Sequence, residues 1–501
     1  MLNSVDHRKG SQHVSVARRS HDVRLLTTCG LVASSLIWLI VAGRSQWPGA
    51  YLLVSLLVLV AAIPVVRAHV AGRLDVFEPI TGICAMYVMY FGFAAVYELN
   101  TPFKEGRLGL EIEDGIQIGL VYAIAALLAL QLGYALAGSY ASGAPAASVV
   151  PVMGWCRVFW TSVLVYGIGL SARVYGVSRG FHIRFAASEV YGQYSGLDIL
   201  YDYMGFLSTY GFILMVAFSF VTPRWRAAGR GLAWGVMLPI EMFFAFLGGP
   251  KEYFIPLLVA PVICYHYGRR AVSVAKVVIP ASVMALIVFP VMTSYRSLDP
   301  GYLRRTTLMD GVGYAISGVW GVLSEKGLPE YVRWSLELVA SRLDGIYTLA
   351  GVLLNVPGSM GYQWGKTIVL GFALLVPTFI WEGKYDYLSK TITWGEGIFG
   401  VPVGGGGISI THPGELFLNF GTAGVLLGMF LLGAAFRLIY EWLVGRRLFF
   451  GIVIYAVLWP TLVVPEYPIA AYFSNAAKQA GLLFLISLAA GARWRRDRTK
   501  A

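Results

Sequence analysis

Charged residues are scarce in this sequence: Asp, Glu, Lys and Arg make up 13% of its 501 residues. A soluble globular chain carries about 25%, so this scarcity excludes a soluble globular protein. Hydrophobic residues reach 57% instead, and they form apolar runs that recur along almost the whole chain. Because about 20 apolar residues in a helix cross the hydrocarbon core of a bilayer, the sequence predicts an all-α polytopic membrane protein.

Cysteine is scarce as well, with four residues in the chain. All of them fall inside apolar runs, and none has the spacing of a metal ligand. A disulfide framework and a zinc site are therefore not expected. The four are Cys29, Cys84, Cys156 and Cys264.

About twelve transmembrane helices are predicted from the apolar runs. The first of them, at 25–43, is long enough to span, so we expect a retained helix rather than a cleaved signal. A further apolar stretch, Thr367–Trp381, is short and contains Pro377. It is predicted to lie on the membrane without crossing it. The predicted spans are 25–43, 50–66, 79–97, 116–138, 155–175, 203–221, 230–248, 253–267, 274–293, 414–437, 448–464 and 477–492.

Lys and Arg set the expected orientation, because they collect on the cytoplasmic side. Both basic tails are expected there, and this explains the net charge of +12 without a nucleic-acid partner. The acid-rich loop 98–115 then faces outward. The predicted organisation is a cytoplasmic tail at 1–24, nine helices within 25–293 with an outer loop at 176–202, a large extracytoplasmic loop at 294–412, three helices within 413–492 and a cytoplasmic tail at 493–501.

Several arginines lie on this predicted outer face, although Lys and Arg usually collect on the cytoplasmic side. Lys plus Arg and Asp plus Glu each number nine between 294 and 412, so an anion site there would depend on a few placed arginines. Guanidinium forks suit phosphate, and ion pairing with nearby aspartates stays open for each. The candidate phosphate-binding residues are Arg173, Arg179, Arg184, Arg296, Arg304, Arg305 and Arg342, together with Lys251, which could instead pair with Glu252.

One short polar stretch precedes the predicted span at 414–437. Pro413 suits the first helical position, which makes His412 the cap residue and Glu415 the third position. By spacings of three and four, Asn419 shares their helical face. Capping alone would explain these residues. The alternative is catalytic: His412 or Glu415 could act as a base beside a helix end that attracts phosphate.

One carboxylate, Glu241, lies near the middle of a predicted span. An intramembrane carboxylate often marks an ion or proton path, which would be expected of a transporter. The glycine-rich stretch 400–407 lacks the Lys-Ser/Thr ending of a P-loop, so nucleotide binding is not indicated. The large outer loop also has five tryptophans and eight tyrosines, which suit either a membrane interface or sugar stacking.

Three stretches carry a family resemblance. "THPGELFLNFGTAGVLLGMFLLG", "RLDVFEPITGICAMYVMYFG" and "YQWGKTIVLGFALLVPTFIWEGKYDY" resemble motifs of the bacterial O-antigen polymerases of the Wzy type, the oligosaccharide repeat unit polymerases. The third contains the pattern P-x-x-I/L-W-x-x-K. The chain departs from the family where many members have arginine, since it has Lys251 and Thr378 there. His412 is similar to a histidine of the related O-antigen ligases.

The resemblance implies a GT-C-like membrane glycosyltransferase of the bacterial inner membrane. Its substrates would be undecaprenyl-pyrophosphate-linked oligosaccharides, as donor and as acceptor, in contact with membrane lipids and a chain-length regulator protein. The arginines would clamp the pyrophosphate, Asn419 would help to bind substrate, and His412 or Glu415 would be the base. No cofactor, metal or nucleotide is implied. A ligase and a flippase or exporter of lipid-linked sugars stay open, although polar groups at the outer ends of helices favour an enzyme.

Overall fold

A computed structural model describes most of the chain between Pro48 and Ala492. The described residues are 48–100, 112–138, 154–179, 196–222, 226–248, 253–298, 308–343, 345–376, 380–381, 383–384, 387–388, 394–399 and 410–492. Every regular element within these ranges is a helix.

Nine helices in the described ranges are long and apolar enough to cross a membrane. Each coincides with one of the predicted spans, which confirms an all-α membrane protein. Two further predicted spans, 253–267 and 448–464, are apolar helices of only 15 residues, Phe254–Gly268 and Phe449–Val463. The predicted span at 25–43 lies outside the described residues. The total of twelve therefore stays a prediction.

The chain folds into two compact units, each assembled from separate segments. The first unit comprises Met1–Ala144, Asp344–Tyr362 and Ser409–Arg437, and the second comprises Pro145–Leu343, Gln363–Ile408 and Leu438–Ala501. The first contains α2 (Pro48–Val70), α3 (Pro79–Tyr87), η1 (Val88–Phe93), α4 (Ala94–Asn100), α5 (Ile112–Ala137), α16 (Gly345–Asn355) and most of α20 (His412–Tyr440).

Within the first unit, α5 and α20 approach each other backbone to backbone. A Cβ atom at Gly133 would lie 1.9 Å from the Phe430 carbonyl oxygen, and one at Gly433 would lie 2.0 Å from that of Leu130. Small residues of this kind allow apolar helices to pack closely where lipid supplies no hydrophobic driving force. Arg437, near the far end of α20, donates to Glu78, the residue before α3, at 2.8 Å and forms an ion pair with it.

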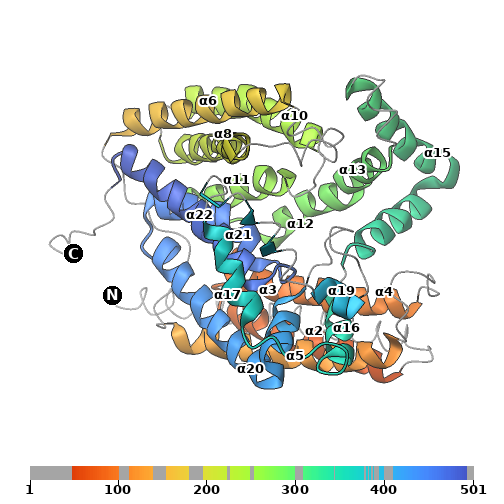
Figure 1. Cartoon of the computed structure of the whole chain (residues 1–501). Coiled ribbons are helices and arrows are strands. Elements are labelled where there is room, and N and C mark those ends of the chain that lie inside the picture. Colours follow the sequence, from red (N-terminus) through yellow and green to blue (C-terminus); the bar gives the residue numbers. More distant parts are fainter. Residues whose placement is uncertain are drawn as a thin grey trace, which may run out of the picture. The chain divides into compact units, whose positions relative to one another are not determined.

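The second unit is built around α8. It contains α6 (Trp155–Ser178), α8 (Gly196–Val221), α9 (Arg226–Leu232), η3 (Ala233–Met237), α10 (Leu238–Gly248), α11 (Phe254–Gly268), α12 (Val274–Val283), η5 (Met284–Val288), α13 (Phe289–Arg296), α15 (Leu308–Ala340), α17 (Lys366–Gly371), η6 (Phe372–Leu375), α19 (Trp394–Phe399), η7 (Glu441–Gly445), α21 (Phe449–Val463) and α22 (Ile469–Ala489). Figure 1 shows α8 between α6 and α11, and it contacts both. Its span is 72% buried, against 17% for Lys276–Arg296.

The large loop is more helical than the sequence predicts, and its helices break elsewhere. The stretch EYVRWSLELVASRLDGIYTLAGVLL has apolar residues at spacings of three and four and predicts one amphipathic helix over 330–354, but α15 ends at Ala340 and α16 begins at Gly345. A second break occurs inside α15 at Gly327, whose φ of 78° departs from helical values. Figure 1 shows the two parts of α15 meeting at an angle. The prediction of one uninterrupted helix was wrong, because the chain turns at residues 341–342; Leu336, on its expected apolar face, is also 42% exposed.

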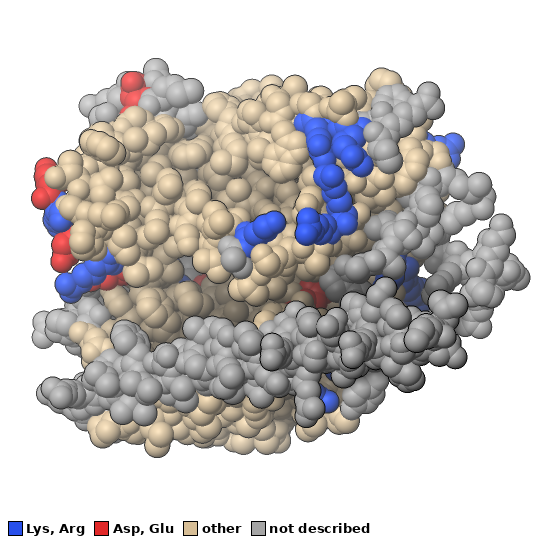
Figure 2. Space-filling model, turned by 180° about the vertical axis from the view of Figure 1, so that it is seen from behind, with Lys and Arg blue, Asp and Glu red and all other residues tan. Residues whose placement is uncertain are grey.

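The outer surface agrees with a lipid environment. Most of the described surface in Figure 2, drawn in tan, is neither acidic nor basic. Large apolar side chains are exposed along the candidate spans, among them Leu52, Trp160 and Leu427. In water such a surface would be unfavourable, whereas a bilayer solvates it.

Candidate functional site

Helix α20 is broken near its beginning. Gly421 has φ 63° and ψ −153°, a backbone conformation that is essentially restricted to glycine. A Cβ at Gly428 would lie 2.4 Å from the side chain of Leu416. In a straight helix these two residues would be about 18 Å apart. The segment 412–420 is therefore a short helix that folds back against the helix beginning after Gly421, so the span predicted at 414–437 is interrupted near its beginning.

Three polar residues of this short helix are buried in the first unit. His412, Glu415 and Asn419 are 3%, 1% and 0% exposed. The Asn419 amide donates to the Glu415 backbone carbonyl at 2.8 Å, as their predicted common face requires. The expected cap was one residue off, because the Thr411 hydroxyl accepts from the Gly414 N–H at 3.2 Å. Thr411, not His412, is the cap residue.

Aromatic residues hold the short helix in place. The Tyr122 hydroxyl of α5 hydrogen-bonds the Thr422 hydroxyl at 2.6 Å, just beyond the break. The Tyr122 ring also contacts the Phe417 ring edge-on, with centroids 5.3 Å apart. Tyr362 lies over Gly421, where its hydroxyl oxygen would be 3.3 Å from a Cβ atom. Tyr122 thus packs against the short helix at Phe417, and Tyr362 packs against the turn at Gly421.

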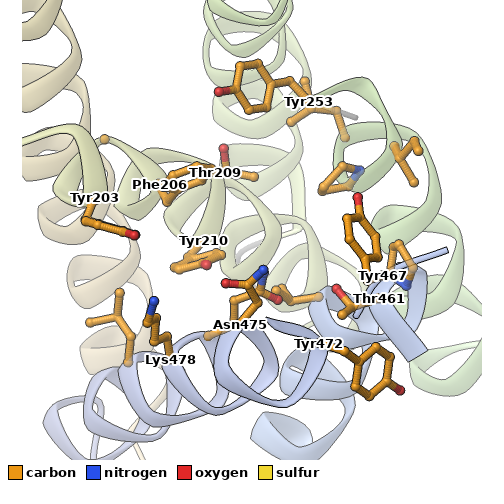
Figure 3. Close-up of a pocket in the computed structure, with 18 of the residues that line it drawn as sticks. Tyr203, Phe206, Thr209, Tyr210, Tyr253, Thr461, Tyr467, Tyr472, Asn475 and Lys478 are labelled. Atoms are coloured by element: carbon orange, nitrogen blue, oxygen red, sulfur yellow. The ribbon is translucent and has the colours of Figure 1, made fainter. Parts of the chain in front are cut away.

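The second unit contains a cavity of about 760 Å³. Helices α6, α8, α10, α11, α21 and α22 contribute to its wall, together with the end of η6. Figure 3 shows side chains of α8, including Tyr203 and Tyr210, facing Asn475 and Lys478 of α22 across the space. Most of the lining residues are apolar or aromatic. A pocket with apolar walls and a few polar groups is the usual form of a small-molecule or lipid site.

Arg173 is anchored at this cavity by three side-chain hydrogen bonds. Its guanidinium donates to Glu241 Oε2 at 3.1 Å, to the Thr209 hydroxyl at 2.9 Å and to the Gly205 carbonyl at 3.0 Å. The Thr209 hydroxyl in turn donates to the same carboxylate oxygen at 2.7 Å. The ring of Phe244 lies 5.4 Å below the guanidinium. The fork of the arginine is therefore fixed in one orientation.

Two lysines that are not among the predicted site residues also line the cavity. Lys384 is only 1% exposed and donates to the Val376 carbonyl at 2.5 Å. Lys478 of α22 lies over the Tyr203 ring, with its ammonium 5.4 Å from the centroid. The described lining residues thus include three cations and one carboxylate, Glu241. Lys384 is the last residue of the quoted P-x-x-I/L-W-x-x-K pattern, which was the available signal.

The short apolar segment before Lys384 is attached to α22. We call residues 366–376, which include α17 and η6, the strap. Gly371 of the strap lies so close to Ala470 that a Cβ would be 2.0 Å from the alanine Cβ. The Ser474 hydroxyl donates to the Gly371 carbonyl at 3.2 Å. With two short helical pieces of six and four residues, the strap is too short to span, although whether it lies on a membrane stays a prediction.

The other predicted site residues are dispersed. Arg173 is the only one of them among the described lining residues of the cavity. Arg179 is exposed at the end of α6, Arg342 is exposed on the turn after α15, and Arg296 is half-buried in the last turn of α13. His412, Glu415 and Asn419 belong to the first unit. Arg184, Lys251, Arg304 and Arg305 lie outside the described residues, as does the glycine-rich stretch 400–407.

The fold and site define a class of protein, an all-α membrane protein with a cationic cavity. No protein-family model, no curated protein and no solved structure matches this chain. The resemblance to the repeat unit polymerases therefore stays a prediction. Among the residues that the structure describes, no group of three or more His, Cys, Asp or Glu side chains could hold a metal ion.

Proposed function

We propose that this protein is a membrane glycosyltransferase that polymerises oligosaccharide repeat units carried on undecaprenyl pyrophosphate, giving O-antigen, capsular or exopolysaccharide. The observation that supports it best is the cavity of the second unit. Its apolar walls suit a lipid chain, and its three cations against one carboxylate suit a diphosphate. The proposed location is the bacterial inner membrane, with both termini cytoplasmic.

In the proposed reaction, the sugar bond to the lipid pyrophosphate breaks and a glycosidic bond to an acceptor hydroxyl forms. The hydroxyl proton passes to a base, and the pyrophosphate leaves with its developing negative charge. Cations held near the leaving group stabilise that charge. Arg173, fixed by Glu241 and Thr209, has the rigid placement that such stabilisation needs.

The candidate base belongs to the first unit. His412 and Glu415 lie on the short helix before Gly421, and both are buried. Burying acid–base groups in an apolar segment is energetically unfavourable. Such groups are therefore commonly retained because they serve a function. Their assignment as the base, and that of Asn419 as a substrate contact, derive from the family resemblance.

The proposal is tested with purified protein reconstituted in liposomes and given one undecaprenyl-pyrophosphate repeat unit. A ladder of lengthening products is expected. Lys478→Gln, which removes a partly exposed cation of the cavity, is expected to abolish the ladder without affecting membrane insertion. A single transfer to a foreign acceptor would instead identify a ligase. A chain-length regulator protein would be recognised by a change in ladder length when it is added.

One observation favours a second candidate, a flippase or exporter of lipid-linked sugars. The break at Gly421 places buried polar residues next to an interrupted helix, and transporters often build substrate sites from broken helices. A fluorescently labelled lipid-linked repeat unit tests this function in the same liposomes. Its movement across the membrane, with no new glycosidic bond, would support the flippase or exporter and contradict the polymerase.

A further inference from the structure

Some of the neutral polar side chains that line the cavity make no hydrogen bond to any described residue. They include Tyr210 of α8, Thr461 of α21 and Asn475 of α22. Figure 3 shows Tyr210 and Asn475 directed into the same space from different helices. Polar groups inside a protein normally have a partner, and a buried tyrosine hydroxyl usually finds one. These side chains therefore mark the place where the polar part of a ligand would supply that partner.

The chemistry of these side chains matches that of a hydroxyl group. A phenol, an aliphatic hydroxyl and a carboxamide can each donate and accept a hydrogen bond, as a ligand hydroxyl can. An ionised phosphate only accepts, so it would leave their accepting atoms unused. An ammonium ligand is disfavoured, because Arg173, Lys384 and Lys478 bring like charges to the same cavity. A neutral group with several hydroxyls fits this part of the wall best.

Aromatic rings lie on the same wall as the Tyr210 hydroxyl. Tyr203, Phe206 and Tyr210 follow one another along α8 at spacings of three and four, so they share one helical face, and all three line the cavity. The Phe206 ring contacts the Tyr253 ring edge-on, with centroids 6.3 Å apart. A sugar has hydroxyls around its ring and apolar C–H groups on its faces, and aromatic side chains pack on such faces.

The remaining wall suits a hydrocarbon chain. Leu374 and Leu375 of η6 and Leu482 of α22 are among its aliphatic residues. The volume of about 760 Å³ is within the usual range of ligand pockets. The cavity thus combines an apolar part with hydroxyl-binding groups, as an amphiphile with a hydroxylated head requires.

We propose that Tyr210, Thr461 and Asn475 bind the hydroxyl groups of a sugar, which packs beside the rings of Phe206 and Tyr253. The ligand chemistry is a neutral polyhydroxyl group, carried either by a lipid or by a free saccharide. The site deepens the proposed function and rests on it for its place in the reaction, where it holds the sugar beside its lipid carrier. Binding itself requires no glycosyl transfer, so the two can be tested separately.

Calorimetry on the full chain in phosphatidylcholine nanodiscs tests the site, with empty nanodiscs as the blank. The probes are farnesyl glucoside, farnesyl methyl ether and glucose. Wild type is expected to bind the glucoside about tenfold or more tightly than the ether, which has the chain but no hydroxyls. Equal affinity for these two probes, or no binding of the glucoside, would overturn the site. Glucose that binds as well as the glucoside would support it with a free saccharide as ligand, and much weaker glucose binding would support it with a lipid-linked sugar.

Tyr210→Phe is the principal variant, because it removes only a hydroxyl that bonds no described residue. It is expected to weaken glucoside binding about fivefold and to leave the ether affinity and the unfolding temperature unchanged. Asn475→Leu, at an exposed position, should weaken glucoside binding similarly. Tyr175→Phe is the matched control, since Tyr175 is 39% exposed and is not among the described lining residues. An equal loss for both farnesyl probes in Tyr210→Phe would overturn the site, because it would report a change in cavity shape.

The outcomes separate this site from the proposed function. Glucoside binding that falls in both Tyr210→Phe and Asn475→Leu supports the site, even if wild type makes no sugar polymer. Glucoside affinity that is unchanged in both variants overturns the site, while a ladder made by wild type would still support the polymerase.

Discussion

The Arg173 guanidinium and the Glu241 carboxylate lie 3.1 Å apart, and the two side chains are only 12% and 1% exposed. They come from α6 and α10, and Thr209 of α8 connects to both. Three helices of the second unit thus converge on one ion pair at the edge of the cavity. A change to this ion pair is therefore expected to affect both the stability of the second unit and its candidate binding site.

Replacing only one member of the Arg173–Glu241 pair is expected to destabilise the protein. Arg173→Met is expected to lower the free energy of unfolding by about 3 kcal/mol, because it leaves a buried carboxylate without its counter-charge. The double variant Arg173→Met/Glu241→Leu should lose less than the single variant, since an apolar pair needs no compensation. Chemical or thermal unfolding in detergent measures both.

A matched control for this prediction is the exposed pair of Arg333 and Glu337 on α15. These groups are 3.1 Å apart, but 70% and 46% exposed. Arg333→Gln should change the unfolding free energy by less than about 0.5 kcal/mol, because solvent screens the pair. If Arg173→Met were as mild as Arg333→Gln, the ion pair would not be a stabilising element of the second unit.

The break in α20 should depend on glycine. Gly421→Ala is expected to destabilise the first unit by about 1 to 3 kcal/mol, because a Cβ atom strains this backbone conformation. Protease sensitivity and thermal unfolding of the purified chain would report it. Gly313→Ala serves as control, since a Cβ there meets nothing within 4 Å and alanine favours the helix. Equal unfolding temperatures for the two variants would contradict the fold-back.

The strap should detach if its contact with α22 is filled. Gly371→Ala is expected to push the strap away from Ala470 and to lower the unfolding temperature of the purified chain. Adding Ala470→Gly should restore part of the lost stability, because the conflict lies between two Cβ atoms. Gly383→Ala, with nothing within 4 Å of its Cβ position, should unfold as wild type does. A wild-type unfolding temperature for Gly371→Ala would contradict the close contact between the strap and α22.

The candidate bases should be needed for activity rather than for folding. Glu415→Gln and His412→Gln keep the size of each side chain and leave the helix bonds to Thr411 in place. Both variants are expected to unfold near the wild-type temperature, and at least one should fail to produce the polymer ladder. Glu337→Gln on the exposed face of α15 is the control. Ladders of normal length from both variants would exclude the pair as the base.

Features that depend on local composition could be predicted from the sequence. Nine spans follow from apolar runs, since the helix is the structure that satisfies the backbone of one segment within lipid. The common face of Glu415 and Asn419 follows from helical spacing, and the hydrogen bond between them agrees. The cap moved by one residue to Thr411, because the chain enters the helix before the proline, not at it.

Features that depend on contacts between distant segments could not be predicted. Arginines on the outer loops were grouped by their expected side of the membrane, yet only Arg173 lies among the described residues of the cavity. Glu241 was identified as a lone carboxylate, whereas it is the partner of Arg173, which precedes it by 68 positions. Lys384 was available from the quoted P-x-x-I/L-W-x-x-K pattern, whereas Lys478 has no local pattern that marks it as a ligand.

The sequence by itself determined that the protein is helical and embedded in a membrane, because hydropathy and the 3.6-residue period act within each segment. Only the tertiary structure decided that α20 folds back at Gly421 and that four separate elements bring Arg173, Glu241, Lys384 and Lys478 to one cavity. The physical reason is that such placements depend on packing between helices, where a close approach of two backbones or a buried ion pair selects one arrangement among many that the same apolar segments allow.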